Sequence, residues 1–409
     1  MKRLTTLLLL MALILPSVGQ TLEDYLMIAA QNNPSLKATY HQFEAALEHI
    51  HQVGTLPDPA IGFGYFISPI ETRTGPQRVK ISLSQMLPWF GTEGAQKDVA
   101  SLIAEAQFDR YLDQKEWLFY QVKANYYPIE EIIEIIDIHQ KHLSIMTTYE
   151  KLAIIAYSNG KSTKTDILKT NNLLEEIRTN INILEGRLKA QKLIFNRLLN
   201  RDDSLEVIAN FFSEPKETDS MNTLDSMVIS HPRLDELTKL IEANVSNEQV
   251  AIKEGLPRLG IGLDYLMINK MDGSTNSNNG KDALIPMISM SLPVFRKKYQ
   301  SRLNEISINQ HTLTAKRNAV RNNLVSELVS TQNTFRESWE AYHLSKRQIE
   351  NAQLQVDFNY KSYGNANVDF DELLISQSDL LKFKLMATTA KKNCAVAQAK
   401  IDYLLVKKL

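Results

Sequence analysis

The sequence contains the phrase LPDPAIGFGY at residues 56–65 and the related phrase LPRLGIGLDY at residues 256–265. The similarity extends beyond these phrases, because Leu87-Pro88-Trp89-Phe90 recurs as Leu292-Pro293-Val294-Phe295. A solenoid would need about three or more copies of such a unit. Two copies with matching flanks therefore indicate an internal duplication.

Each phrase begins a stretch in which apolar residues alternate with glycine, serine or charged residues. A period of two is typical of β-strands that present one apolar and one polar face. The pattern predicts one pair of strands over 57–88 and a second pair over 257–293. The expected apolar, outward positions are Ile61, Phe63, Tyr65, Ile261, Leu263 and Tyr265.

Helical patterns flank both strand pairs. We expect a helix over 21–54 before the first pair and a helix over 230–254 before the second. Long stretches that are poor in glycine and proline follow over 92–201 and 295–408, and their apolar residues show the heptad spacing of coiled-coil hairpins. The predicted divisions are a first structural repeat, residues 20–201, an equatorial belt segment, residues 202–229, and a second structural repeat, residues 230–409.

The N-terminus and the composition limit the class of protein. Lys2 and Arg3 precede a short apolar run and small residues, which predicts a secretory signal peptide over 1–19, because the run is too short to cross a bilayer. The 46 Lys+Arg residues balance the 47 Asp+Glu residues, which gives no support to nucleic acid as a partner. Cys394 is the only cysteine, so an intramolecular disulfide is excluded.

The two strand pairs pose a problem of unpaired edges. A soluble sandwich would cover the apolar face with a second sheet, but the sequence predicts no further strands. If the face contacts lipid, open edges are forbidden, because each unsatisfied backbone group costs several kcal/mol in hydrocarbon. Four strands cannot close a barrel, since the smallest membrane barrels have about eight. Several chains must therefore pool their strands.

Three motifs, taken in order, resemble the TolC family of outer-membrane efflux proteins. They are TLEDYLMIAAQNNPSLKA at 21–38, SQMLPWFGT at 84–92 and YSNG at 157–160, within the duplicated order of helix, strand pair and long helical hairpin. The resemblance covers essentially the whole mature chain. It implies a mainly α-helical homotrimer in the outer membrane of a Gram-negative bacterium, with a twelve-stranded β-barrel in the outer-membrane lipid and a twelve-helix periplasmic tube.

The resemblance also implies an exit duct, with neither enzymatic activity nor a cofactor. An inner-membrane pump, of the RND type, and a periplasmic adaptor protein would pass substrate into the tube. The SQMLPWFGT motif resembles that of the family branch that accompanies heavy-metal pumps. Metal cations and small toxic compounds are therefore the two candidate cargoes. The alternative function is a periplasmic coiled-coil adaptor or a structural scaffold, against which the duplication and the amphipathic strands argue.

In the family, the tip of the tube is normally shut, and the resemblance places this gate at the two helical turns. The first turn matches the family pattern Tyr-x-x-Gly, whereas the tyrosine and glycine of the second turn are adjacent. Glu372 aligns with a gate acid of the family. Two interpretations stand: the acids line the pore and bind cations, or they stabilise the first turn of the last helix. The candidate tip and gate residues are Tyr157, Gly160, Asp166, Tyr363, Gly364, Asp369, Asp371 and Glu372.

One further pair of residues has a spacing found in metal sites. His139 and His142 lie three residues apart in a helical stretch, a spacing that can place two nitrogens on one metal ion. An exposed polar helix face explains the pair as well, so the sequence predicts no metal site. It also offers no Ser/His/Asp arrangement, phosphate-binding loop or Cys/His cluster.

Overall fold

The computed structural model describes residues 21–209, 214, 230–364 and 368–406. The predicted signal peptide and most of the predicted belt segment lie outside these residues. The chain divides into two compact units, and each of the two longest helices has one part in each unit. The strand-bearing unit comprises residues 39–112 and 232–321, and the tip-bearing unit comprises the described residues within 21–38, 113–231 and 322–406.

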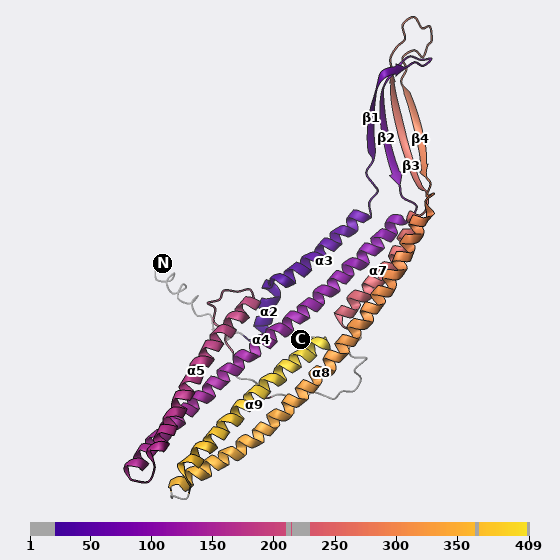
Figure 1. Ribbon diagram of the computed structural model, residues 1–409. Coiled ribbons are helices and arrows are strands. Elements are labelled where there is room, and N and C mark those ends of the chain that lie inside the picture. The colour runs from indigo at the N-terminus through magenta and orange to yellow at the C-terminus, as the bar shows by residue number, and fades with distance from the viewer. Residues whose placement is uncertain (1–20, 210–213, 215–229, 365–367, 407–409) are drawn as a thin grey trace, which may run out of the picture. The chain divides into compact units, whose positions relative to one another are not determined.

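The strand-bearing unit contains one antiparallel sheet in the order β1-β2-β3-β4, with strands that lie side by side in Figure 1. Each repeat contributes one hairpin, and the pairing of β2 with β3 joins the two repeats. The bounds are Ala60–Ile70 for β1, Gln77–Leu87 for β2, Arg258–Ile268 for β3 and Ala283–Ser291 for β4. The strands therefore lie within the two predicted segments.

Four helices contribute to the same unit. They are α3 (Pro34–Val53), the first part of α4 (Thr92–Ser158), α7 (Pro232–Glu254) and the first part of α8 (Arg296–Gly364). Aromatic contacts join α3 to α4, with the rings of Phe43 and Phe108 5.2 Å apart. The side chain of Asn244 on α7 donates a hydrogen bond to the carbonyl oxygen of Ile306 on α8, at 3.0 Å.

The expected single helix over 21–54 is wrong in one respect, because the chain forms α2 (Leu22–Asn32) and α3 with a break at Asn33. Asn33 is extended, with ψ 122°, since the ring of Pro34 disfavours a helical residue before it. The freed side chain of Asn33 then caps α3, accepting hydrogen bonds from the backbone N–H groups of Ser35 and Leu36 at 3.0 and 3.2 Å.

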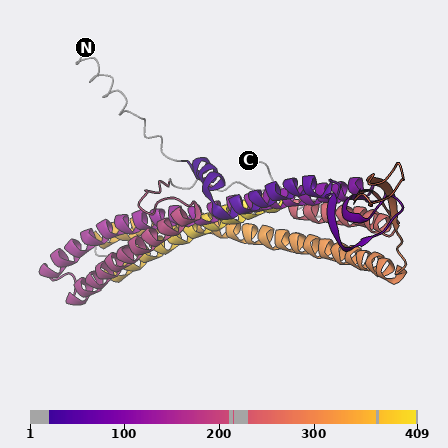
Figure 2. The same cartoon turned by 90° about the horizontal axis from the view of Figure 1, so that it is seen from above.

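The tip-bearing unit contains two helical hairpins, which run alongside each other in both views (Figures 1 and 2). The first pairs α4 with α5 (Lys164–Leu198), and the second pairs α8 with α9 (Phe370–Leu404). Helix α2 packs on the first hairpin through Tyr25, whose ring meets that of Phe195 edge-on at 5.1 Å. None of the helices within the described residues carries an apolar stretch long enough to cross a membrane.

Candidate functional site

The turn between α4 and α5 is closed by a glycine in the left-handed region. Gly160 has φ +70°, and its N–H donates to the carbonyl oxygen of Tyr157 at 3.0 Å, while the N–H of Lys161 donates to that of Ala156 at 2.8 Å. These are the two hydrogen bonds of a Schellman motif. Gly160 is thus required by the turn, because a β-carbon disfavours positive φ. The side chain of Tyr157 is exposed.

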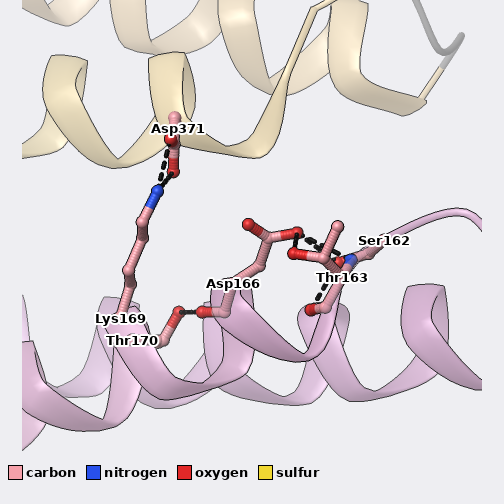
Figure 3. Close-up of polar contacts among 6 residues, drawn as sticks. All are labelled: Ser162, Thr163, Asp166, Lys169, Thr170 and Asp371. Atoms are coloured by element: carbon pink, nitrogen blue, oxygen red, sulfur yellow. Dashed lines mark hydrogen bonds and ion pairs between the residues drawn. The ribbon is translucent and has the colours of Figure 1, made fainter.

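Asp166 lies in the first turn of α5 and forms a capping box with Thr163, the N-cap. Its carboxylate accepts hydrogen bonds from the backbone N–H and the hydroxyl of Thr163, both at 2.9 Å, and from the hydroxyl of Ser162 at 2.8 Å (Figure 3). Partial burial acts to raise the pKa of this carboxyl, but the hydrogen bonds and the charge of Lys169 outweigh it and hold the pKa below its ordinary value. The structure thus gives Asp166 the role of a helix cap.

The helix ends on either side of the second turn, at the end of α8 and the start of α9, differ from those of the first. Tyr363, in the last turn of α8, packs against Phe370, the first residue of α9, with ring centroids 5.5 Å apart. Gly364 ends α8, and Asp369 is the N-cap of α9 but its side chain makes no cap hydrogen bond. The start of α9 therefore lacks the reciprocal capping that fixes the start of α5.

Asp371 links the two hairpins. Its carboxylate oxygens accept hydrogen bonds from the ammonium group of Lys169 on α5 at 2.7 and 2.5 Å (Figure 3). The two side chains are 49% and 46% exposed, so water partly screens the pair. This ion pair lies one helical turn beyond the Asp166 cap and connects helices that belong to different repeats.

An apolar core lies beside this ion pair and contains residues from α4, α5 and α9. Its buried members are Met146, Tyr149, Ala153, Leu174, Ile177, Ile181, Phe370, Leu373 and Leu374. Gln377 on α9 adds a buried hydrogen bond, from its side-chain amide to the hydroxyl of Tyr149 on α4 at 3.1 Å. The two hairpins are therefore packed together at the tip, and the charged pair sits at the rim of that contact.

Glu372 differs from its neighbour Asp371. Its side chain is exposed, and its backbone carbonyl accepts a hydrogen bond from the side chain of Asn359 on α8 at 3.3 Å. Successive helical residues point about 100° apart, so only one of the two acids can reach Lys169. The structure thus separates a paired acid, Asp371, from an acid that is exposed to solvent, Glu372.

The outward face of the sheet is apolar and exposed. Paired residues across the strands share one face, so the register Phe63 to Ile81 to Tyr265 places these three side chains together. Exposure within the single chain is 77% for Ile61, 73% for Phe63, 58% for Tyr65, 53% for Ile261, 40% for Leu263 and 38% for Tyr265. Such a large apolar surface indicates contact with lipid or with another protein.

The opposite face of the sheet carries small and charged residues in β1, β2 and the middle of β3, next to the apolar side chains of Leu266, Ile285 and Met287. Gly62 pairs with Ser82, and Ser82 pairs with Asp264. Asp264 is almost fully buried on this face and forms an ion pair with Lys80. A face with a paired charge and small side chains suits water rather than hydrocarbon.

His139 and His142 are both buried in the tip-bearing unit, which contradicts the interpretation of an exposed polar face. Burial lowers the pKa of both imidazoles, that of His142 to about 4, with further lowering there from the nearby charges of His139 and Lys384. Among the described residues, no group of three or more His, Cys, Asp or Glu side chains is placed to hold a metal ion.

Sequence reasoning missed the Lys169 to Asp371 pair and the Gln377 to Tyr149 hydrogen bond. No local signal could have found either, because the partners are 202 and 228 residues apart along the chain. The role of Asp166 was accessible, since Thr163 followed three residues later by an acid is a capping-box signature.

An amphipathic four-stranded sheet joined to two long helical hairpins defines a class of protein, the outer-membrane channels with a helical periplasmic part. Known proteins that are similar to this chain belong to the same class. The model of the family described as outer membrane efflux protein matches residues 26–201. The outer membrane efflux protein BepC of Brucella suis biovar 1 is 21% identical over 393 residues, which cover 93% of this chain and 84% of BepC.

Two solved structures share the fold. A membrane protein from Pseudomonas aeruginosa has a TM-score of 0.78 at 14% identity, covering 94% of this chain and 93% of that one. The outer membrane channel MtrE of Neisseria gonorrhoeae, in its open state, has a TM-score of 0.75 at 15% identity, covering 94% and 88%.

Residues 26–201 thus match the outer membrane efflux protein family, and the chain shares the fold of a solved outer membrane channel. It is therefore a channel protein of the outer membrane with a large periplasmic helical part, and not an enzyme. Its function is that of the exit duct in an efflux system. The match to this family implies a trimer that works with a periplasmic adaptor and an inner-membrane pump.

Proposed function

We propose that three copies of this chain close their sheets into one twelve-stranded barrel in the outer membrane, and their helices into one periplasmic tube. The observation that carries this proposal is a four-stranded sheet that has an exposed apolar face and, within the described residues, two unpaired edges, β1 and β4. Unpaired backbone groups cost several kcal/mol each in hydrocarbon. Pairing β4 of one copy with β1 of the next removes that cost.

In this barrel, the face with Phe63 and Leu263 contacts lipid, and the face with Gly62, Lys80 and Asp264 lines the lumen. The register supports the assignment, because it places Phe63, Ile81 and Tyr265 together on one face and Gly62, Ser82 and Asp264 together on the other. A shift by one residue would exchange the two faces.

At the tip, the ion pair between Lys169 and Asp371 holds the two hairpins of one copy together in the closed state. Glu372 faces the axis, where threefold symmetry brings three carboxylates close to one another. Because like charges repel at close quarters, a multivalent cation would be a strong counter-ion there. Tyr157 and Tyr363 lie at the two turns that bound this constriction.

The adaptor binds the periplasmic part, and the pump is of the RND type. Metal cations or small toxic compounds are the cargo, which the pump selects and the tube only conducts. The resemblance of SQMLPWFGT at 84–92 to the heavy-metal branch supports metal cations as the first cargo to test.

The assembly is tested by native mass spectrometry of the purified full-length protein in mild detergent. We expect a trimer, and we expect that outer membranes release the protein only on addition of detergent. A monomer whose circular dichroism still reports the strands would contradict the shared barrel. Release by a high-salt wash alone would favour the adaptor or scaffold function instead.

A further inference from the structure

A cluster of positive charge follows directly on the last strand. Beyond the end of β4, Val294 and Phe295 are 70% and 81% exposed. The next three residues, Arg296, Lys297 and Lys298, form the first turn of α8 and are all exposed. Apolar side chains that would reach lipid are thus followed at once by three cations, at the rim where the sheet meets the helices (Figure 1).

The position of these charges is unfavourable for the helix itself. The N-terminal turn of a helix carries a partial positive charge, which favours acidic and disfavours basic residues, yet the first turn of α8 contains no acid. In the part of the chain that the structure describes, no carboxylate lies within ion-pair distance of Arg296, Lys297 or Lys298. Lys298 only approaches the ring of Tyr299, at 6.0 Å. Helix stability therefore does not explain the cluster.

The first repeat shows that the turn does not require basic residues. The matching turn after β2 continues from Phe90 to Gly91, Thr92 and Glu93, with Gly91 at φ +76° and an acid in the first turn of α4. The same strand-to-helix connection is thus made once with an acid and once with three cations. The difference points to a ligand at the second copy only.

We propose that Arg296, Lys297 and Lys298 bind the phosphate headgroup of an anionic phospholipid in the periplasmic leaflet of the outer membrane. Arg258 lies at the same rim, since its backbone N–H bonds the hydroxyl of Ser291 at 3.1 Å, and it adds a fourth cation. Exposed Phe295 inserts among the acyl chains beside the headgroup, as aromatic residues do at membrane interfaces. The proposal depends on the placement of the sheet in lipid.

Clusters of basic residues beside a membrane segment bind anionic lipids, and each Lys or Arg strengthens binding by a factor of about five. Three such residues give a preference of up to roughly a hundredfold for an anionic over a zwitterionic lipid. The preference should fall as salt is raised, because exposed charges are screened.

The test uses the full-length protein in mild detergent and native mass spectrometry. Binding of phosphatidylglycerol is compared with binding of phosphatidylethanolamine that has the same acyl chains, and with inorganic phosphate as a soluble competitor. The variant is R296Q/K297Q/K298Q. The matched control is K316Q/R347Q/K361Q, which removes three exposed cations of the same helix away from the rim.

We expect the wild type and the control to prefer phosphatidylglycerol, and the rim variant to bind both lipids alike. F295A should weaken both lipids without changing their ratio. Retention of the preference in the rim variant would overturn the proposal, as would an equal loss in the control. Competition by inorganic phosphate at the same concentration as the lipid would also overturn it, in favour of a free-anion site. The same spectra report the trimer, so a failure of assembly is distinguished from a failure of lipid binding.

Discussion

Removing the Lys169 to Asp371 ion pair should shift the channel towards its open state. The two side chains are about half exposed, and ion pairs with this exposure contribute about 0.2–1 kcal/mol. Three copies act together in the trimer, so K169Q should destabilise the closed tip by about 0.6–3 kcal/mol. This corresponds to a roughly 3- to 150-fold increase in the ratio of open to closed channels.

The assay is the open probability of single channels in planar bilayers at low and high salt. K169Q should open more often than the wild type at low salt and resemble it at high salt, because salt screens the wild-type pair. K164Q is the matched control. It removes an exposed lysine from the first turn of the same helix, α5, and no ion pair of Lys164 occurs among the described residues.

A charge exchange separates the ion pair from the total charge of the tip. The double variant K169D/D371K restores the attraction between α5 and α9, so its open probability should return towards that of the wild type. The return should be incomplete, because Asp371 also favours the first turn of α9 through the helix dipole, and a lysine there does not. Equal effects of K169Q and K164Q, together with no rescue in the double variant, would refute the role of the pair.

Four further outcomes follow from the same structure. Phe63→Arg on the outward face should impair membrane insertion by about 2–4 kcal/mol near the bilayer midplane. Gly62→Ser should be mild, because its new β-carbon would meet Ser82 only at an ordinary 3.5 Å; equal defects in a membrane-flotation assay would refute the facing. Glu372→Ala should abolish block by divalent cations added on the tip side, measured as single-channel current, and unchanged block would remove it from the gate. Asp166→Asn should cost about 1 kcal/mol at neutral pH through loss of the capping box. Because the pKa of Asp166 is lowered on folding, that difference should shrink as the pH falls below about 4, which thermal unfolding across pH would show. Burial, opposed by a hydrogen bond from Tyr126 and the charge of Lys391, raises the pKa of Glu130 to about 7. The proton on folded Glu130 stabilises the protein, and this stabilisation is lost as the pH rises through that value. The melting temperature of E130Q should therefore be above that of the wild type at about pH 8 and equal to it at about pH 4. Equal melting temperatures at both pH values would contradict a buried Glu130 that is charged at about pH 8.

The strands and long helices could be predicted from the sequence because their signals are local. Alternation around Phe63 and heptad spacing through α5 are read within a few residues of each other. The helix break at Asn33 was not predicted, because the apolar pattern continues across the junction. Pro34 was the local signal for it, since proline disfavours a helical residue before it. The burial of His139 was missed for a different reason, because burial depends on how α4 packs against the rest of its unit. The partnership of Lys169 with Asp371 joins separate repeats, and only the folded chain brings them together.

The helices that begin after the two tip turns, α5 and α9, are stabilised in different ways. Local hydrogen bonds satisfy the backbone at the turn before α5. They are made by Gly160 at the end of α4 and by the capping box of Thr163 and Asp166 at the start of α5. The turn before α9 has no such cap, and its acids are directed elsewhere: Asp371 bonds a neighbouring helix and Glu372 remains exposed. Helix ends without side-chain caps open more readily. We therefore expect the start of α9, rather than the start of α5, to move if the proposed gate opens at the tip.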